Sequence, residues 1–170
     1  MAEIEIEKKY IIEMPDVSDM RACADYTLSR ITQTYLDCLP GITHRVRMRE
    51  YDNGRVEFTE TVKRRIDRMS SYEDEREITS AEYEALLEKI KRGTKSLYKL
   101  RHTFVYFSQL FEIDVYPEWK NTCIMETELR AEDATVEMPP FIRIIEDVTG
   151  QREYSNAAMS ASFPEEKKLG

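Results

Sequence analysis

The sequence predicts one α+β domain, residues 1–170, in which antiparallel β-strands close into a barrel with charged side chains inside and helices outside. Its length suits a single domain that buries about 70% of the surface exposed by the unfolded chain. Charged and apolar residues alternate in several short segments, with the period of two that strands require. Each segment carries charge mainly of one sign. Neighbouring strands are therefore expected to share one charge-rich face.

The first predicted strand lies at residues 3–10, with the sequence EIEIEKKY. Its alternation places Glu5, Glu7 and Lys9 on one face and apolar side chains on the other. A single strand of this kind would ordinarily lie at the protein surface, with its carboxylates in water. The same alternation recurs at residues 44–49, 58–63, 72–77, 98–102, 111–116 and 125–129. This recurrence favours a common role for the charged faces.

Turn and capping residues predict the elements of the N-terminal half. Pro15 and Asp16 precede a short helix of uncertain limits. Residues 29–36 alternate as a further strand, which ends before the Leu-Pro-Gly turn at 39–41. An Asp-Asn-Gly sequence at 52–54 predicts a hairpin turn between two charged strands.

The later elements are predicted in the same way. The basic segment 64–71 lacks alternation and is expected to be a loop. A helix over 79–92 begins with a Thr-x-x-Glu capping box and carries an apolar stripe that should lie on the sheet. A turn near Ser108 joins two strands, and a second helix is predicted near 141–148. Residues 164–170 are expected to form a loose tail.

Charge signs are segregated among the predicted strands. If the charged faces pointed to solvent, the fold would be an ordinary β-sandwich with an apolar interior and a charged surface. A closed barrel with a polar lumen gives like charges two residues apart a common site, while helices cover its apolar outside. We favour the barrel because random surface charges would mix their signs more. Carboxylates pair at positions 5/7, 73/75, 112/114 and 126/128, and cations pair at 45/47 and 99/101, with Lys9 and Lys63 in addition.

Composition argues against several classes of function. The net charge of −8 at pH 7 disfavours nonspecific binding to nucleic acid and to anionic membranes. No window holds the roughly 18 apolar residues of a membrane span, and the N-terminus is acidic where a signal peptide would be basic, so we expect a cytoplasmic protein. Three scattered cysteines and two histidines leave little material for a Cys/His metal site or nucleophile.

The inward charges predict bound cations and an anionic ligand. Eight carboxylates outnumber six cations in the expected lumen, and so much charge is costly to bury without ions or water. About two divalent cations would make the net charge positive, as in two-metal phosphoryl-transfer sites. Oxygen ligands select Mg²⁺ or Mn²⁺ over zinc, and arginine side chains suit phosphate oxygens. The expected ligand is therefore a small-molecule polyanion such as a triphosphate.

The order of these motifs resembles that of the CYTH superfamily of triphosphate tunnel metalloenzymes. ExExK at Glu5, Glu7 and Lys9 is followed in order by RVR, TVK, ExE, KLR, EID and ETE. REYSN at 152–156 resembles an ending common in bacterial members. The resemblance implies an eight-stranded antiparallel tunnel that binds triphosphates with a divalent metal and usually hydrolyses them, although some members cyclise ATP or cleave thiamine triphosphate.

The resemblance also implies roles for individual residues, with Lys9, Lys63 and Arg101 as catalytic groups. Two positions depart from the family pattern: Ser71 stands where many relatives have arginine, and Arg64 stands where many have glycine. The outer end of the substrate would therefore be held differently. The implied metal ligands are Glu5, Glu7, Glu73, Glu75, Asp114, Glu126 and Glu128, and the implied substrate ligands are Lys9, Arg45, Arg47, Lys63, Lys99, Arg101 and Arg152.

These observations predict metal-dependent hydrolysis of inorganic triphosphate or of a small organic triphosphate. A class IV type of adenylate cyclase is the first alternative, although no stretch specifies adenine recognition. A noncatalytic protein that binds polyphosphate or nucleotide is the second, and the complete set of carboxylate pairs disfavours it. The sequence leaves open the substrate, the preferred metal, the general base and the oligomeric state, a homodimer included.

Overall fold

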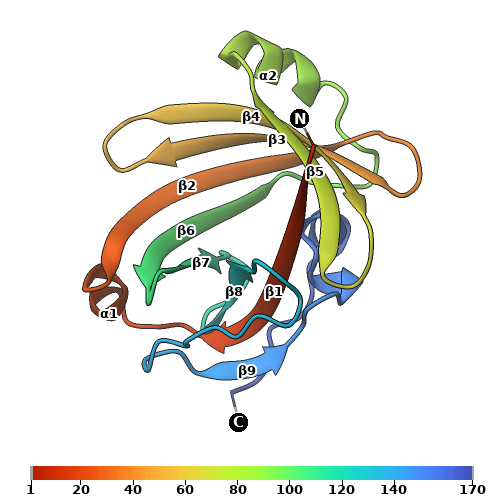
Figure 1. The fold of residues 1–170 in the computed structure, drawn as a ribbon. Coiled ribbons are helices and arrows are strands. Elements are labelled where there is room, and N and C mark those ends of the chain that lie inside the picture. Colours follow the sequence, from red (N-terminus) through yellow and green to blue (C-terminus); the bar gives the residue numbers. More distant parts are fainter. Residues whose placement is uncertain (1, 170) are drawn as a thin grey trace.

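The computed structural model describes residues 2–169, and eight of its strands form one closed antiparallel barrel (Figure 1). Around the ring the order is β1, β5, β4, β3, β2, β6, β7 and β8, and the pairing of β8 with β1 closes it. The predicted eight-stranded barrel is confirmed. The strands are β1 Glu3–Glu13, β2 Ala24–Leu36, β3 Ile42–Tyr51, β4 Val56–Arg65, β5 Ser70–Glu77, β6 Leu97–Tyr106, β7 Gln109–Val115, β8 Thr122–Glu128 and an additional β9 Ile144–Asp147.

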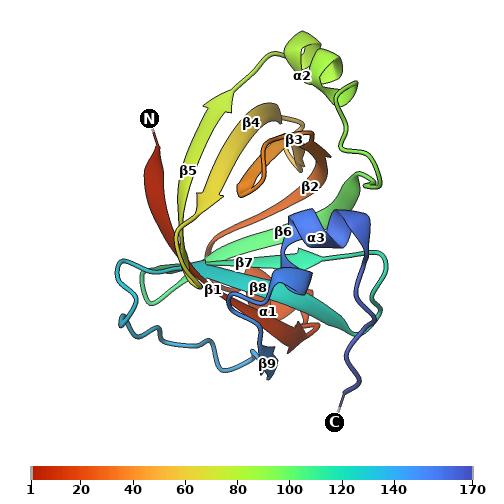
Figure 2. The same cartoon turned by 90° about the vertical axis from the view of Figure 1, so that its right-hand side faces the viewer.

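The helices are short and lie outside or at one end of the barrel (Figures 1 and 2). None of those described is long and apolar enough to cross a membrane. They are α1 Val17–Arg21, α2 Ser80–Leu87, α3 Asn156–Ala161 and a 3₁₀ helix, η1, at Arg152–Tyr154.

The strand register turns the charged faces inward. Arg45 lies opposite Thr61, which in turn lies opposite Glu75 on the next strand, and all three line the central cavity. Ile4, on the other face of β1, is 57% exposed on the outside. Ile113 is fully buried, but within an apolar cluster on the outer face that α1 and the segment before β9 cover. The predicted arrangement, with charge inside the barrel, agrees with this register.

Helix α2 covers part of the outer face of β2, β3 and β4. Its predicted capping box is present, because the Thr79 hydroxyl accepts the N–H of Glu82 and the Glu82 carboxylate accepts the N–H of Thr79. The helix is shorter than the predicted span of 79–92. It ends at Leu87, and Ile90 instead joins an isolated β-bridge to the end of β2.

The helix predicted near 141–148 is wrong, because this segment contains strand β9. Ile144 lies opposite Ile12 in an antiparallel pairing with β1. Strand β5 covers the same edge of β1 only as far as Ile6. The rest of that edge is open to another strand, and the β-branched residues of β9 suit it better than they suit a helix.

The loop predicted at 64–71 is also shorter than expected. Strand β4 continues to Arg65 and β5 begins at Ser70, which leaves a four-residue turn. The Asp67 carboxylate accepts the N–H groups of Met69 and Ser70 and so fixes the turn.

The tail predicted to be loose, residues 164–170, is held against the start of β8 in its described part. The Glu166 carboxylate accepts three consecutive backbone N–H groups, those of residues 120–122. The Trp119 indole N–H donates to the carbonyl oxygen of Pro164. These long-range hydrogen bonds could not be read from the composition of the tail.

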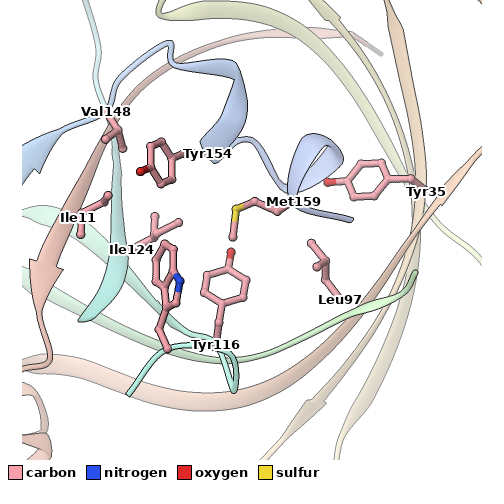
Figure 3. Close-up of a cluster of buried hydrophobic side chains, with 9 residues drawn as sticks. Ile11, Tyr35, Leu97, Tyr116, Ile124, Val148, Tyr154 and Met159 are labelled. Atoms are coloured by element: carbon pink, nitrogen blue, oxygen red, sulfur yellow. The ribbon is translucent and has the colours of Figure 1, made fainter. Parts of the chain in front are cut away.

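One end of the barrel is filled by apolar side chains. Figure 2 shows α3 lying across this end, and Figure 3 shows its Met159 within the barrel, in a cluster with Tyr35, Leu97 and Tyr116. The other buried members of the cluster are Ile11 of β1, Ile124 of β8, Trp119, Val148 and Tyr154. The charged part of the lumen is therefore confined to the remaining length of the barrel.

Candidate active site

The barrel encloses a cavity of about 660 Å³ beside α3. Two predicted site residues, Lys99 and Asp114, are buried and do not reach the cavity surface. The other predicted site residues line it: Glu5, Glu7, Lys9, Arg45, Arg47, Lys63, Glu73, Glu75, Arg101, Glu126, Glu128 and Arg152. The structure thus brings most of the sequence-predicted set into one space.

Carboxylates from β1, β5 and β8 form an acidic wall, in which two lysines supply the nearby positive charge. The Nζ atom of Lys63 lies 3.3 Å from Glu5 Oε1 and 3.7 Å from Glu73 Oε2. The Nζ atom of Lys9 lies 3.3 Å from Glu126 Oε1 and donates to the backbone carbonyl of residue 154. Each lysine therefore links strands that are distant in sequence.

The carboxylates of the acidic wall outnumber these lysines. The pKa values of three of them, Glu5, Glu7 and Glu128, are raised. Burial raises the pKa of Glu5, and the neighbouring Glu73 raises it further. Burial also raises the pKa of Glu7 well above its usual value, with the negative charge of Glu126 as the second cause. For Glu128, burial and then the charge of Glu5 raise the pKa. A bound cation would relieve this excess of negative charge.

Arg45 and Arg47 of β3 form a basic wall across the barrel from β8, because these strands are four places apart around the ring. Arg47 donates from Nε and Nη2 to Gln33 Oε1, at 3.0 and 2.7 Å, so its partner is neutral. Arg45 is 3.8 Å from Glu75, and its buried Nε has no hydrogen-bond partner among the described residues. Burial, with the charges of Arg45 and Arg101, lowers the pKa of Arg47 to about 9. The basic wall carries positive charge that an anion would balance.

Lys99 and Arg101 of β6 are paired with Asp114 of β7. The Lys99 Nζ atom lies 2.8 Å from Asp114 Oδ2, and Arg101 donates to both oxygens of the same carboxylate, at 2.7 and 2.8 Å. Arg101 also contacts Glu112 at 2.7 Å. Although burial would raise the pKa of Asp114, Arg101 and Lys99 hold it well below its usual range. Asp114 therefore lies with these cations and not on the acidic wall, where its expected role as a metal ligand would place it.

Solved structures with the same architecture relate this chain to known proteins, whereas no family model and no curated protein matches it. The inorganic triphosphatase NE1496 is 26% identical to it, with a TM-score of 0.56 over 94% of this chain and 96% of that one. The PH1012 protein from Pyrococcus horikoshii OT3 is 18% identical, with a TM-score of 0.55 over 75% and 80% of the two chains. A candidate adenylate cyclase from Bacillus halodurans is 19% identical, with a TM-score of 0.52 over 77% and 83%. The chain has the CYTH fold.

The acidic wall of this CYTH barrel suits a divalent cation in its chemistry. Its donors are carboxylate oxygens, which Mg²⁺ and Mn²⁺ accept. Within residues 2–169, however, no group of three or more His, Cys, Asp and Glu side chains is already drawn together as a metal site. A cation would therefore have to replace lysine contacts, such as those of Lys63 with Glu5 and Glu73.

Two residues that support the candidate site were not among the predicted site residues. Gln33 is fully buried, accepts from Arg47 and donates to the Tyr35 hydroxyl at 2.6 Å. Arg49 lines the cavity and donates to Ser29 at 2.9 Å. The sequence contains a signal for each, since Gln33 is a polar residue between Ile31 and Tyr35 on one strand face and Arg49 continues the alternation of Arg45 and Arg47.

Proposed function

We propose that this protein hydrolyses inorganic triphosphate, or a small organic triphosphate, with the help of Mg²⁺ or Mn²⁺. The observation that carries the proposal is a cavity with an acidic wall on one side and Arg45 and Arg47 on the other, where Arg47 bonds a neutral glutamine and Arg45 lies 3.8 Å from Glu75. A polyphosphate chain bound to a divalent cation has the charge distribution that complements both walls. The likeness to NE1496, itself an inorganic triphosphatase, supports the same reaction class.

The residues of the chain would act mainly by binding and positioning the substrate. Arg45 and Arg47 would bind phosphate oxygens, because guanidinium groups match their geometry and keep their charge when buried. Arg101, which lines the cavity while Asp114 fixes its side chain, would stabilise negative charge on the transferred phosphoryl group. Lys9 and Lys63 stand at the acidic wall and would contact the same group from the other side.

The carboxylates would hold the metal, and water would be the nucleophile. Glu5, Glu7, Glu126 and Glu128 line the acidic wall, with Glu73 and Glu75 from β5 beside them. A divalent metal bound there would supply Lewis-acid chemistry. The reaction adds water across a phosphoanhydride bond, so the attacking oxygen bonds to phosphorus, the bridging oxygen leaves with the shorter phosphate chain, and the released proton passes to solvent or a carboxylate.

A phosphate-release screen tests this function directly. Purified protein is incubated with tripolyphosphate, ATP, GTP and thiamine triphosphate, each with Mg²⁺ and with Mn²⁺, and the products are identified. We expect orthophosphate and the shortened chain from at least one triphosphate, loss of activity in EDTA, and loss of activity in Glu5→Gln with the fold retained. Cyclic AMP and pyrophosphate from ATP would show a cyclase instead, and binding without turnover would show a noncatalytic protein.

A further inference from the structure

Three arginines stand where the turn between β4 and β5 meets the segment before α3, and all three line the cavity. Arg65 is the last residue of β4, Arg68 lies in the turn, and Arg152 begins η1. We call Arg65, Arg68 and Arg152 the basic rim. Of these, only Arg152 was expected at the site from the sequence.

The basic rim interrupts a regular pairing of polar groups along β4 and β5. On successive inward positions of β4, Thr61 donates to Glu75 at 2.8 Å and Lys63 lies 3.7 Å from Glu73. At the next inward position, the ladder places Arg65 opposite Ser71, a small buried residue without charge. Arg65 therefore lacks a carboxylate on β5, whereas Thr61 and Lys63 each face one.

Backbone carbonyl groups hold two of the three rim arginines, Arg65 and Arg68, in place. Arg65 donates from Nε to the carbonyl oxygen of Asp67 at 2.9 Å and from Nη2 to that of Gly150 at 2.8 Å. Arg68 donates from Nε to the carbonyl oxygen of Thr149 at 3.0 Å. These bonds orient the side chains without cancelling their charge.

The backbone at Gly150 allows the turn between β4 and β5 to approach closely. Gly150 has a φ of +75°, and a Cβ atom there would lie 2.2 Å from Arg68 Cγ and 2.8 Å from the Arg68 carbonyl oxygen. A residue with a side chain would push the rim apart. The Asp67 carboxylate, the acidic group of the turn, is occupied by two backbone N–H groups. Across residues 2–169, Arg65, Arg68 and Arg152 make no ion pair within 4.0 Å.

We propose that the basic rim binds the terminal phosphate of a linear phosphoanhydride chain whose other phosphates lie between the two walls of the cavity. Arg65 is two residues beyond Lys63 on the same strand face, an advance of about 7 Å. It therefore binds a phosphate group farther along the ligand than the one near Lys63. The bare end of the substrate, and not an organic group, then lies in the part of the cavity lined by the basic rim. This inference rests on the proposed function, because it assigns an orientation to the same ligand.

The test compares Arg65→Ala with Arg64→Ala. Arg64 is the adjacent residue on the opposite face of β4, and its guanidinium lies over the Tyr72 ring, 4.9 Å from the centroid. Binding of tripolyphosphate and of pyrophosphate is measured by calorimetry in EDTA. We expect Arg65→Ala to weaken tripolyphosphate binding by about 10-fold or more, with a much smaller effect on pyrophosphate, and Arg64→Ala to leave both unchanged. Arg65→Lys should recover part of the loss, since lysine keeps the charge but loses the paired donors.

Kinetic measurements separate this inference from the proposed function. If the wild type hydrolyses tripolyphosphate and Arg65→Ala matches Arg64→Ala in both Kd and KM, the rim assignment is wrong and the hydrolase stands. If the wild type releases no phosphate, the hydrolase proposal is wrong, while selective loss of tripolyphosphate binding in Arg65→Ala still supports the rim. Weakened inhibition by orthophosphate, with unchanged binding of tripolyphosphate, would assign the rim to a released product and overturn the inference.

Discussion

Two pairs of cations with the same spacing have opposite electrostatic surroundings in this barrel. Lys99 and Arg101 on β6 share the carboxylate of Asp114, with contacts of 2.7 to 2.8 Å. Arg45 and Arg47 on β3 are partly buried, and Arg47 contacts a neutral glutamine while Arg45 lies 3.8 Å from Glu75. The first pair is neutralised within the protein, whereas the second retains charge for a ligand.

The difference arises from the residue that each strand meets across the ladder. Arg101 lies opposite Asp114 in the pairing of β6 with β7, and Arg47 lies opposite Gln33 in the pairing of β2 with β3. The carboxylate of Asp114 balances the charge of Arg101, whereas the amide of Gln33 leaves the charge of Arg47 unbalanced. Spacing along one strand therefore predicts which way a cation points, and the neighbouring strand decides what it binds.

The largest effect is expected where the compensated pair is broken, in Asp114→Asn. This change leaves Lys99 and Arg101 buried without their shared counter-charge, so the free energy of unfolding should fall by about 3 to 5 kcal/mol. Urea unfolding at pH 7 measures it. Glu112→Gln is the control, since among residues 2–169 Glu112 forms an ion pair with Arg101 alone and its side chain is 27% exposed. If both variants lose the same stability, Asp114 does not hold this region together.

The pH dependence of stability also tests the role of Asp114, because its stabilising contribution should fall as the pH is lowered. The folded-state pKa of Asp114 lies well below that of an unfolded aspartate, about 3.9. Its contribution is therefore present above that pH and is lost as the pH falls through it toward the folded-state value. Asp114→Asn should remove this part of the acid sensitivity, and unfolding curves between pH 5 and pH 2 would measure the difference.

The next prediction compares the activity and the stability of Arg47→Met with those of Arg101→Met. Both changes remove a cavity cation, so kcat/KM should fall by about 10- to 150-fold in each. Their stabilities should differ. Arg101→Met removes two hydrogen bonds from the buried Asp114, which keeps its contact with Lys99, and should cost about 3 kcal/mol. Arg47→Met removes a partly buried charge whose hydrogen-bond partner is neutral, and the variant should be no less stable than the wild type. Equal losses of stability would show that the two pairs have the same surroundings.

The sequence predicted the local features of this fold well. Alternation identified the inward face of β1, β3 and β5 because a period of two follows from the backbone alone. The capping box at the start of α2 was equally local, as it needs only two side chains three residues apart. Residues such as Glu5, Arg45 and Glu75 could therefore be assigned to one cavity before any contact was known.

Features that depend on distant contacts were not predictable in the same way. Asp114 belongs to the inward face, but its partners are set by the register between β6 and β7. The segment of β9 contains an apolar run that suits either a short helix or a strand, and the open edge of β1 decides between them. The hydrogen bonds that the Glu166 carboxylate accepts from the backbone at 120–122 likewise join residues more than 40 positions apart.

A smaller effect is expected from Gln33→Glu, which gives Arg47 the type of partner that Arg101 has. The new carboxylate would compensate Arg47 in the free protein, so triphosphate binding should weaken by about 5-fold, equivalent to roughly 1 kcal/mol. Tripolyphosphate titration by calorimetry measures the change. Gln33→Met is the control, because it removes the hydrogen bonds without adding charge. Tighter binding in Gln33→Glu would contradict the claim that the free charge of Arg47 serves the ligand.

The smallest effect should come from Arg76→Ala, which removes a cation on the outer face of β5. Arg76 pairs with Glu60 and Glu82, and its side chain is 59% exposed. Exposed ion pairs contribute about 0 to 1 kcal/mol, so stability should change little, and kcat/KM should stay within about twofold because no cavity contact is lost. Steady-state kinetics beside Arg47→Met makes the comparison. A loss in Arg76→Ala equal to that in Arg47→Met would mean that position on the inner face does not determine which cations act on the substrate, and the distinction between inner and outer faces would fail with it.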